Sequence, residues 1–239
     1  MAGFMKLFAA TSVPGVLRIP GRWVWSENSI GPWGYVVLQE DAATLVDPPY
    51  FSQELATQIR EIAPKGVSHI LLTHDDFVGM SGHEQWHQEF DQQPLRVAHR
   101  ADCHGLELQL DGPGPWKVGD FDVYHVPGHS AGSLFYALPK LSAIFTGDSL
   151  GDWSGPTGFP QHCRFGRSRQ AASLRGFAKH AGSWQAVLPG HGKPMYFQKE
   201  AQWLEAINQA ARGLEGSVLS CRGARTTKLR RIAMLKSHL

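Results

Sequence analysis

The 239-residue sequence has few cysteines and no long apolar run, and both absences narrow what the chain can be. Its three cysteines, Cys103, Cys163 and Cys221, lie far apart and form no Cys-x-x-Cys pair. Such a set suits reduced thiols better than a disulfide framework, so we expect a cytoplasmic protein. No apolar stretch approaches the roughly 18 residues that a membrane helix needs. A Pro-Gly pair interrupts the short apolar segment 6–17, which argues against a signal peptide.

An excess of charge of one sign is also missing. The 23 Lys and Arg residues nearly balance the 21 Asp and Glu residues, so the formal net charge is only +2. This charge is too small to indicate nucleic-acid binding, which usually relies on a strongly basic surface. A hydrophobic content of 42% and an aromatic content of 10% indicate a folded chain with a substantial core.

Hydrophobic periodicity predicts strands and helices in a mixed order. Strands are predicted over residues 5–18, 22–26, 33–39, 43–46, 68–73, 95–98, 121–126, 133–138, 142–146 and 186–188. Helices are predicted over residues 52–62, 82–90, 170–180 and 197–212. Glycines and prolines predict loops over 111–115 and 151–166. This order favours two sheets packed together with helices outside them.

Polar side chains directly follow predicted strands at four places in the chain. A single histidine in such a position is usually a hydrogen-bonded structural residue. Four such positions favour a metal site instead, because a metal explains why polar groups gather where a sheet ends. Imidazole and carboxylate groups are ligands of zinc and of mononuclear iron. The four positions are His74, His129, Asp148 and His191.

The same four segments resemble, in their order, the motifs of the metallo-β-lactamase superfamily. The motifs are Thr-His at 73–74, Pro-Gly-His-Ser-Ala-Gly-Ser at 127–133, Phe-Thr-Gly-Asp-Ser at 145–149 and Pro-Gly-His-Gly at 189–192. The likeness extends from about residue 28 to residue 212, and the strand ending at Asp47 resembles the family's early strand. The resemblance implies an α+β fold, a four-layer αββα sandwich with a metal site at one edge. We therefore predict one domain over residues 1–212 and a basic C-terminal extension over 213–239.

The first motif departs from the family pattern. The family usually shows His-x-His-x-Asp-His after the first strand, whereas this chain has His-Asp-Asp-Phe-Val-Gly at 74–79. Asp76 replaces the second histidine, and the family's aspartate and third histidine fall on Val78 and Gly79. The resemblance thus implies that the second metal site keeps fewer ligands than the first.

The resemblance assigns a fuller ligand set to one site than to the other. The first site would consist of His74, Asp76, His129 and Asp148, and the second of Asp148 and His191 only. Three hypotheses explain the incomplete second site. In the first, His83 completes it through the flexible segment 79–82; in the second, one ion suffices. In the third, the fold has lost its metal and binds ligands without catalysis.

The resemblance also implies the chemistry. With one or two divalent ions (Zn, Fe or Mn), the chain would hydrolyse an ester, thioester, lactone or phosphoester, with Asp76 or Asp75 accepting a proton. A carboxylate in place of an imidazole favours a harder ion than zinc. The persulfide dioxygenase branch is similar in holding a single iron through residues that match His74, His129 and Asp148, which gives an oxidoreductase alternative.

Three other segments leave alternatives open. Three arginines within 162–169 either clamp an anionic small-molecule substrate or belong to a solvated loop. The segment 99–104 packs two histidines and a cysteine together, which indicates either support for a metal site or simply the start of a helix. The segment 216–239 has no acidic residue and six basic ones, so it either binds an acidic partner or extends into solvent.

Overall fold

The computed structural model describes residues 8–21, 31–76, 82–151, 165–180 and 182–215. Within these ranges the strands form two mixed sheets, one of seven strands and one of six. The first sheet contains, in chain order, β1 (Ala9–Ala10), β2 (Val16–Pro20), β3 (Trp33–Val37), β4 (Ala43–Val46), β5 (Val67–Leu71), β6 (Leu95–His99) and β7 (Leu108–Leu110). Neighbours are antiparallel from β1 to β4 and parallel from β4 to β7.

The second sheet has the spatial order β13-β12-β11-β10-β9-β8. Its strands are β8 (Trp116–Val118), β9 (Phe121–His125), β10 (Leu134–Leu138), β11 (Ala143–Gly147), β12 (Ala186–Pro189) and β13 (Met195–Tyr196). A 3-10 turn, η1 (Pro139–Leu141), joins β10 to β11. Strands β11 and β12 pair in parallel, and the other neighbours are antiparallel.

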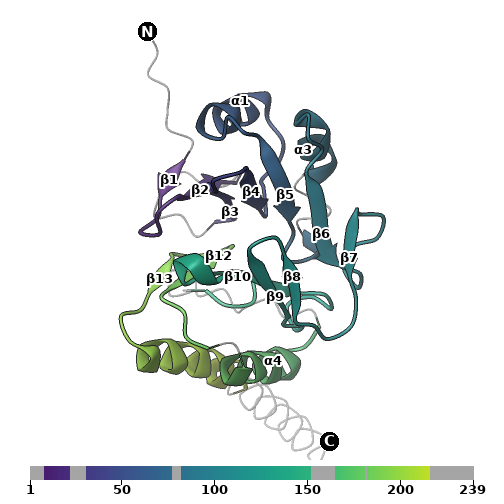
Figure 1. The fold of residues 1–239 in the computed structure, drawn as a ribbon. Helices are drawn as coiled ribbons and strands as arrows, with labels where there is room; N and C mark the ends of the chain where they lie inside the picture. Colours follow the sequence, from purple (N-terminus) through teal and green to yellow (C-terminus); the bar gives the residue numbers. More distant parts are fainter. Residues whose placement is uncertain (1–7, 22–30, 77–81, 152–164, 181, 216–239) are drawn as a thin grey trace, which may run out of the picture.

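Helices cover the outer face of each sheet (Figure 1). Helices α1 (Gln53–Ile62) and α3 (His83–Glu89) lie on the first sheet, and α4 (Arg167–His180) and a helix over 200–215 lie on the second. Helix α1 begins where the sequence predicts, because the Ser52 side chain accepts a hydrogen bond from the Leu55 N–H at 3.1 Å. Its buried residues lie at helical spacing: Leu55, Ala56 and Ile59.

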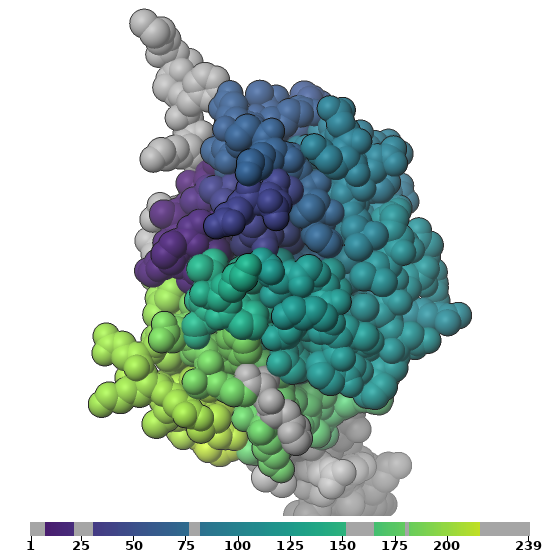
Figure 2. All heavy atoms as spheres, viewed as in Figure 1, coloured from purple at the N-terminus to yellow at the C-terminus, as the bar shows by residue number. Residues whose placement is uncertain are grey.

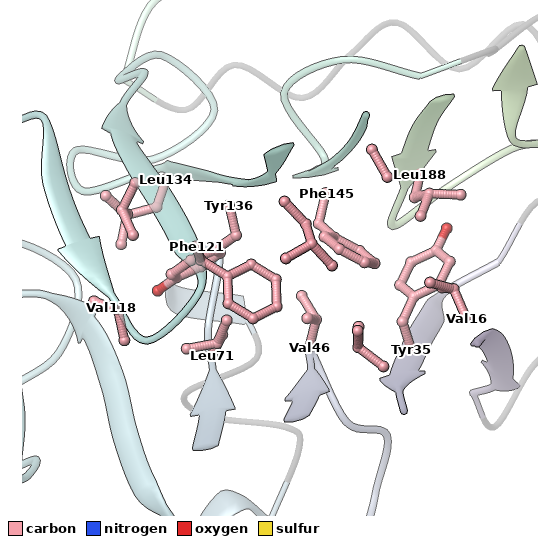
Figure 3. Packing of buried hydrophobic residues seen from close by; sticks show 14 of the residues in the cluster. Val16, Tyr35, Val46, Leu71, Val118, Phe121, Leu134, Tyr136, Phe145 and Leu188 are labelled. Carbon is pink, nitrogen blue, oxygen red and sulfur yellow. The ribbon is translucent and has the colours of Figure 1, made fainter. Parts of the chain in front are cut away.

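Three layers of buried side chains hold the four layers of secondary structure together. The central layer lies between the sheets and includes Tyr35, Tyr136 and Phe145 (Figure 3). A second layer joins the first sheet to α1 and α3, and a third joins the second sheet to α4 and the helix over 200–215. In the space-filling view, the blue residues of the first half pack directly against the teal and green residues of the second (Figure 2). The predicted αββα sandwich is confirmed.

The structure refines several predicted elements. The strand predicted over 5–18 is two strands, β1 and β2, separated by a turn in which Gly15 has φ of +73°. Strands β7, β8 and β13 were not predicted, and the strand predicted over 22–26 lies outside the described residues. Among the described helices, none is long and apolar enough to cross a membrane.

Candidate metal centre

Four side-chain atoms from three separate segments converge at one edge of the sandwich. They are His74 Nε2, Asp76 Oδ2, His129 Nε2 and Asp148 Oδ2, and they lie within 4.8 Å of one another. We call these atoms the four-donor cluster. His74 follows β5, His129 lies between β9 and β10, and Asp148 follows β11. The chain therefore brings together residues up to 74 positions apart in sequence.

The spacing of the four-donor cluster suits a metal ion. Each histidine nitrogen lies 3.5 or 3.6 Å from Asp76, and 3.6 or 3.9 Å from Asp148. A tetrahedral zinc site with bonds of about 2.0–2.2 Å has neighbouring ligand atoms about 3.3–3.6 Å apart. The cluster is thus slightly wider than a loaded zinc site. Its two carboxylates would balance the charge of a divalent ion.

Burial supports the same fit. His74, His129 and Asp148 are buried, and the Asp76 side chain is 36% exposed, which leaves one open side. The described residues offer no hydrogen-bond partner to Nδ1 or Nε2 of His129, or to Oδ1 of Asp148. A buried polar atom without a partner is costly unless something else, such as an ion, satisfies it. The donor set therefore fits a metal.

A hydrogen-bond relay orients His74. Thr73 Oγ1 donates to Asp47 Oδ2 at 2.6 Å and lies 2.8 Å from His74 Nδ1. Because the hydroxyl hydrogen is committed to the carboxylate, the hydroxyl oxygen accepts the Nδ1 hydrogen of His74. When the ring is neutral, this leaves Nε2 as the lone-pair nitrogen that faces the cluster. Asp47 also accepts a hydrogen bond from the Thr73 N–H at 2.8 Å, so two hydrogen bonds join Thr73 to Asp47.

Charges inside the site shift three pKa values. Burial raises the pKa of Asp47 to about 6, against the opposing effects of His74 and Thr73. Burial alone would lower the pKa of His74, but Asp148 and Asp76 raise it to about 9. Burial raises the pKa of Asp148, but the neighbouring His74 and His191 together lower it by more, to about 2. Asp148 therefore stays ionised, and the site favours positive charge at its centre.

The turn before Asp148 requires glycine. Gly147 has φ of +50°, and a Cβ atom there would lie 2.2 Å from Thr73 Oγ1 and 3.1 Å from His74 Nδ1. Only a residue without a side chain lets β11 come this close to the end of β5. Gly147 thereby places Asp148 beside His74.

The last motif is held from the first sheet. The Trp33 N–H donates to the Gly190 carbonyl at 2.7 Å, and the Tyr35 hydroxyl donates to the Pro189 carbonyl at 2.6 Å. Arg18 donates to the Gly192 carbonyl at 2.8 Å and stacks on the Trp33 ring. These contacts hold the 189–192 loop in place. They put His191 Nε2 3.3 Å from Asp148 Oδ2, next to the four-donor cluster but outside it.

Besides His191, two predicted site residues lie outside the four-donor cluster. Asp75 is half-buried at the start of a helical turn. His83 is buried at the start of α3, and its Nδ1 lies 3.3 Å from the Arg96 guanidinium. Val78 and Gly79, where the family pattern is broken, lie outside the described residues, as does Arg164 of the proposed anion clamp.

The segment 99–104 supports the site through a residue that we did not single out. Asp102 accepts hydrogen bonds from Ser130 Oγ at 2.5 Å and from the Gly132 N–H at 2.7 Å, in the loop that carries His129. Cys103 is a buried free thiol whose pKa is raised by burial. The sequence shows a polar cluster after β6, but no neighbouring residue indicates that this cluster contacts the loop that carries His129.

A separate cavity of about 700 Å³ lies at the other end of the sandwich. Its lining includes Ser68 and His69 at the beginning of β5, whereas His74 follows the end of that strand. The turn after β8 also lines it, as do Lys140 and Leu141 of η1. This cavity therefore does not belong to the candidate metal centre.

Solved structures with the same fold include DIM-1 metallo-β-lactamase, which is 18% identical with a TM-score of 0.65. The match covers 86% of this chain and 96% of that one. VMB-1 is 16% identical with a TM-score of 0.68, over 90% of this chain and 99% of that one. The metallo-β-lactamase FIM-1 from Pseudomonas aeruginosa, in its mono-zinc form, is 19% identical with a TM-score of 0.65. The match covers 86% of this chain and 94% of that one. The chain has the metallo-β-lactamase fold.

Comparison of this metallo-β-lactamase-fold chain with curated proteins adds relatives that match only part of it. No family model matches it. Hydroxyacylglutathione hydrolases of Brucella ovis and Brucella abortus are each 29% identical over 111 residues, which is 45% of this chain and 42% of those proteins. The chain thus matches less than half the length of these curated relatives.

Proposed function

We propose that this chain is a metal-dependent hydrolase with one carboxylate-rich metal site. The observation that carries the proposal is the four-donor cluster of His74, Asp76, His129 and Asp148, with spacings of 3.5–3.9 Å. A divalent ion held there would polarise a carbonyl or phosphoryl oxygen and lower the pKa of water to about 7. The relatives named as hydroxyacylglutathione hydrolases support hydrolysis as the reaction class.

One ion fits the ligand inventory better than two. Val78 and Gly79 have no ligand atom in their side chains, so a second ion would share Asp148 and depend on His191. His83 lies beside the Arg96 guanidinium, and a nearby positive charge opposes binding of a second cation. The FIM-1 structure in its mono-zinc form is a precedent for one ion in this fold.

The chain's own residues have distinct roles in this proposal. Asp148 holds the centre of the site and accepts a hydrogen bond from His191, whose side chain is partly exposed. Asp76 is the most open of the four donors, so it is the carboxylate best placed to meet an incoming substrate and accept a proton. The Thr73 relay and the 189–192 contacts keep these groups oriented before substrate binds.

Substrates to test are a thioester, a lactone and a phosphoester, with an acylglutathione first because of the relatives' name. We expect about one equivalent of Zn, Fe or Mn in protein purified without chelator. The His129→Ala variant should lose both this metal and turnover. The matched control, His87→Ala, removes a half-buried histidine on α3 whose Nδ1 bonds to the Pro94 carbonyl, and it should keep both. Unchanged metal content in His129→Ala would refute the assignment.

A mononuclear-iron dioxygenase is the second candidate. It rests on two histidines and one carboxylate, His74, His129 and Asp148, which is a ligand set that such iron sites use. It predicts iron in the purified protein and oxygen uptake with a persulfide. The hydrolase predicts neither oxygen uptake nor a requirement for iron. A protein that binds no metal under any condition would instead be a non-catalytic member of the fold.

A further inference from the structure

The two histidines of the four-donor cluster are held in different ways. The His74 ring is oriented by the Thr73 hydroxyl at its Nδ1. The Nδ1 of His129 has no hydrogen-bond partner among the described residues, although its ring is buried. A metal-ligating histidine usually donates its second ring N–H to a neighbour, and that bond fixes the ring. Within the part of the chain that the structure describes, the position of His129 therefore depends on the backbone of its loop.

That loop, residues 127–133, is held by a compact group of hydrogen bonds. Asp102 accepts from Ser130 Oγ at 2.5 Å and from the Gly132 N–H at 2.7 Å. Ser133 Oγ accepts from the Ser130 N–H at 2.9 Å and lies 2.6 Å from Ser130 Oγ. We call Asp102, Ser130, Gly132 and Ser133 the Asp102 clamp. It lies directly after His129, because Ser130 is the next residue in the chain.

The Asp102 clamp joins the two sheets at the metal edge. Asp102 lies between β6 and β7 of the first sheet, whereas the loop joins β9 to β10 of the second. A second link nearby runs from the Leu134 N–H to the Thr73 carbonyl at 2.8 Å. The clamp therefore connects the segment that carries His129 with the sheet that carries His74.

We propose that Asp102 is a positioning residue, which fixes the 127–133 backbone so that the His129 ring faces the other three donors. It takes the place of the ring hydrogen bond that the described residues do not offer to His129. Both carboxylate oxygens are used, and bonds from N–H and O–H groups to an ionised carboxylate are among the stronger hydrogen bonds in proteins. The inference rests on the proposed metal site and assigns to Asp102 a part in setting its affinity.

The close packing around Asp102 supports this role. A Cβ atom at Gly132 would lie 2.8 Å from the Asp102 carboxylate carbon and 2.9 Å from the His99 Cβ. The His99 carbonyl accepts the Asp102 N–H at 3.0 Å, and the His99 ring stacks on His125 with centroids 4.1 Å apart. His125 Nε2 in turn lies 2.9 Å from the Ala131 carbonyl. The carboxylate thus has little freedom to move away from the loop.

The test compares zinc and cobalt affinity with the stability of the metal-free protein. Asp102→Ala removes both acceptor oxygens and should weaken metal binding by about 10–100-fold, as loss of a group that supports a ligand typically does. Asp102→Asn keeps an acceptor for the Gly132 N–H and should recover most of the affinity. The control Asp122→Asn changes an aspartate at the other end of β9, paired with Lys117 at 2.8 Å, and should bind metal like wild type.

The outcomes separate the two proposals. If wild type binds no metal, the proposed function fails before the variants are compared. If wild type binds metal and folded Asp102→Ala binds it equally well, Asp102 is only structural and the inference is overturned. If Asp102→Ala does not fold, the Ser130→Ala variant takes its place. An affinity loss in Ser130→Ala with wild-type affinity in Asp122→Asn would support the clamp, and wild-type affinity in Ser130→Ala would overturn it.

Discussion

Replacing Thr73 with valine tests how the site orients its first histidine. The substitution keeps the shape of the side chain but removes the hydroxyl that donates to Asp47 at 2.6 Å and lies 2.8 Å from His74 Nδ1. Asp47 would keep only the bond from the Thr73 N–H. The ring of His74 would lose the contact that places its Nε2 toward the cluster.

The loss of stability expected for Thr73→Val follows from the burial of the groups involved. Asp47, Thr73 and His74 are all buried, and a hydrogen bond to a charged group contributes about 1.5–3 kcal/mol. We expect the metal-free Thr73→Val protein to lose about 2–3 kcal/mol, or roughly 4–12 °C in Tm for a domain of this size. Metal affinity should fall by about 10–100-fold, because the ring of His74 is no longer fixed.

The matched control is Thr44→Val. Thr44 is also fully buried, but its hydroxyl donates to the neutral Gln39 side chain at 2.8 Å at the other end of the sandwich. Its loss should cost about 0.5–1.5 kcal/mol and leave metal affinity unchanged. Calorimetric unfolding of the metal-free proteins and a zinc titration measure both quantities. Equal zinc affinity in the two variants would refute the relay.

Three further predictions concern stability. Gly147→Ala should unfold far more easily than wild type in a thermal melt, because its φ is +50° and its Cβ would meet Thr73 Oγ1 at 2.2 Å. Gly176→Ala, in α4 with open space around it, should instead stabilise by up to about 1 kcal/mol; equal melts would contradict the close approach. The pKa of Glu107 is lowered to about 2 by hydrogen bonds from Arg96, so its contribution to stability is present above about pH 4.5 and is lost as the pH falls toward 2. Glu107→Gln should lower stability at neutral pH and flatten this part of the acid-unfolding curve, and an unchanged curve would show that the ion pair contributes nothing.

Local patterns were enough to predict the long elements and the positions of three donors of the four-donor cluster. Helix α1 has an N-cap serine and apolar residues at helical spacing, and β4 is a short apolar run with the predicted bounds. His74, His129 and Asp148 each follow a strand, and the ends of neighbouring strands meet at one edge of the sandwich. These features depend on a few consecutive residues, so they can be found without knowing the fold.

Features that depend on distant partners could not be found in this way. Strands β7, β8 and β13 have only two or three residues, and pairing with a neighbour defines them more than their own composition does. Asp102 binds Gly132, which lies 30 positions away on the other sheet. The link between Thr73 and Leu134 is likewise set by how the sheets pack. Such contacts follow from the tertiary structure alone.

The most direct test of the central claim is a crystal structure with anomalous data collected at the absorption edge of the bound metal. We predict one peak, surrounded by His74, Asp76, His129 and Asp148, with His191 beside it. Two peaks of similar occupancy on either side of Asp148 would contradict the single site. A peak elsewhere on the protein, or none after soaking with zinc, iron and manganese in turn, would contradict the metal centre itself.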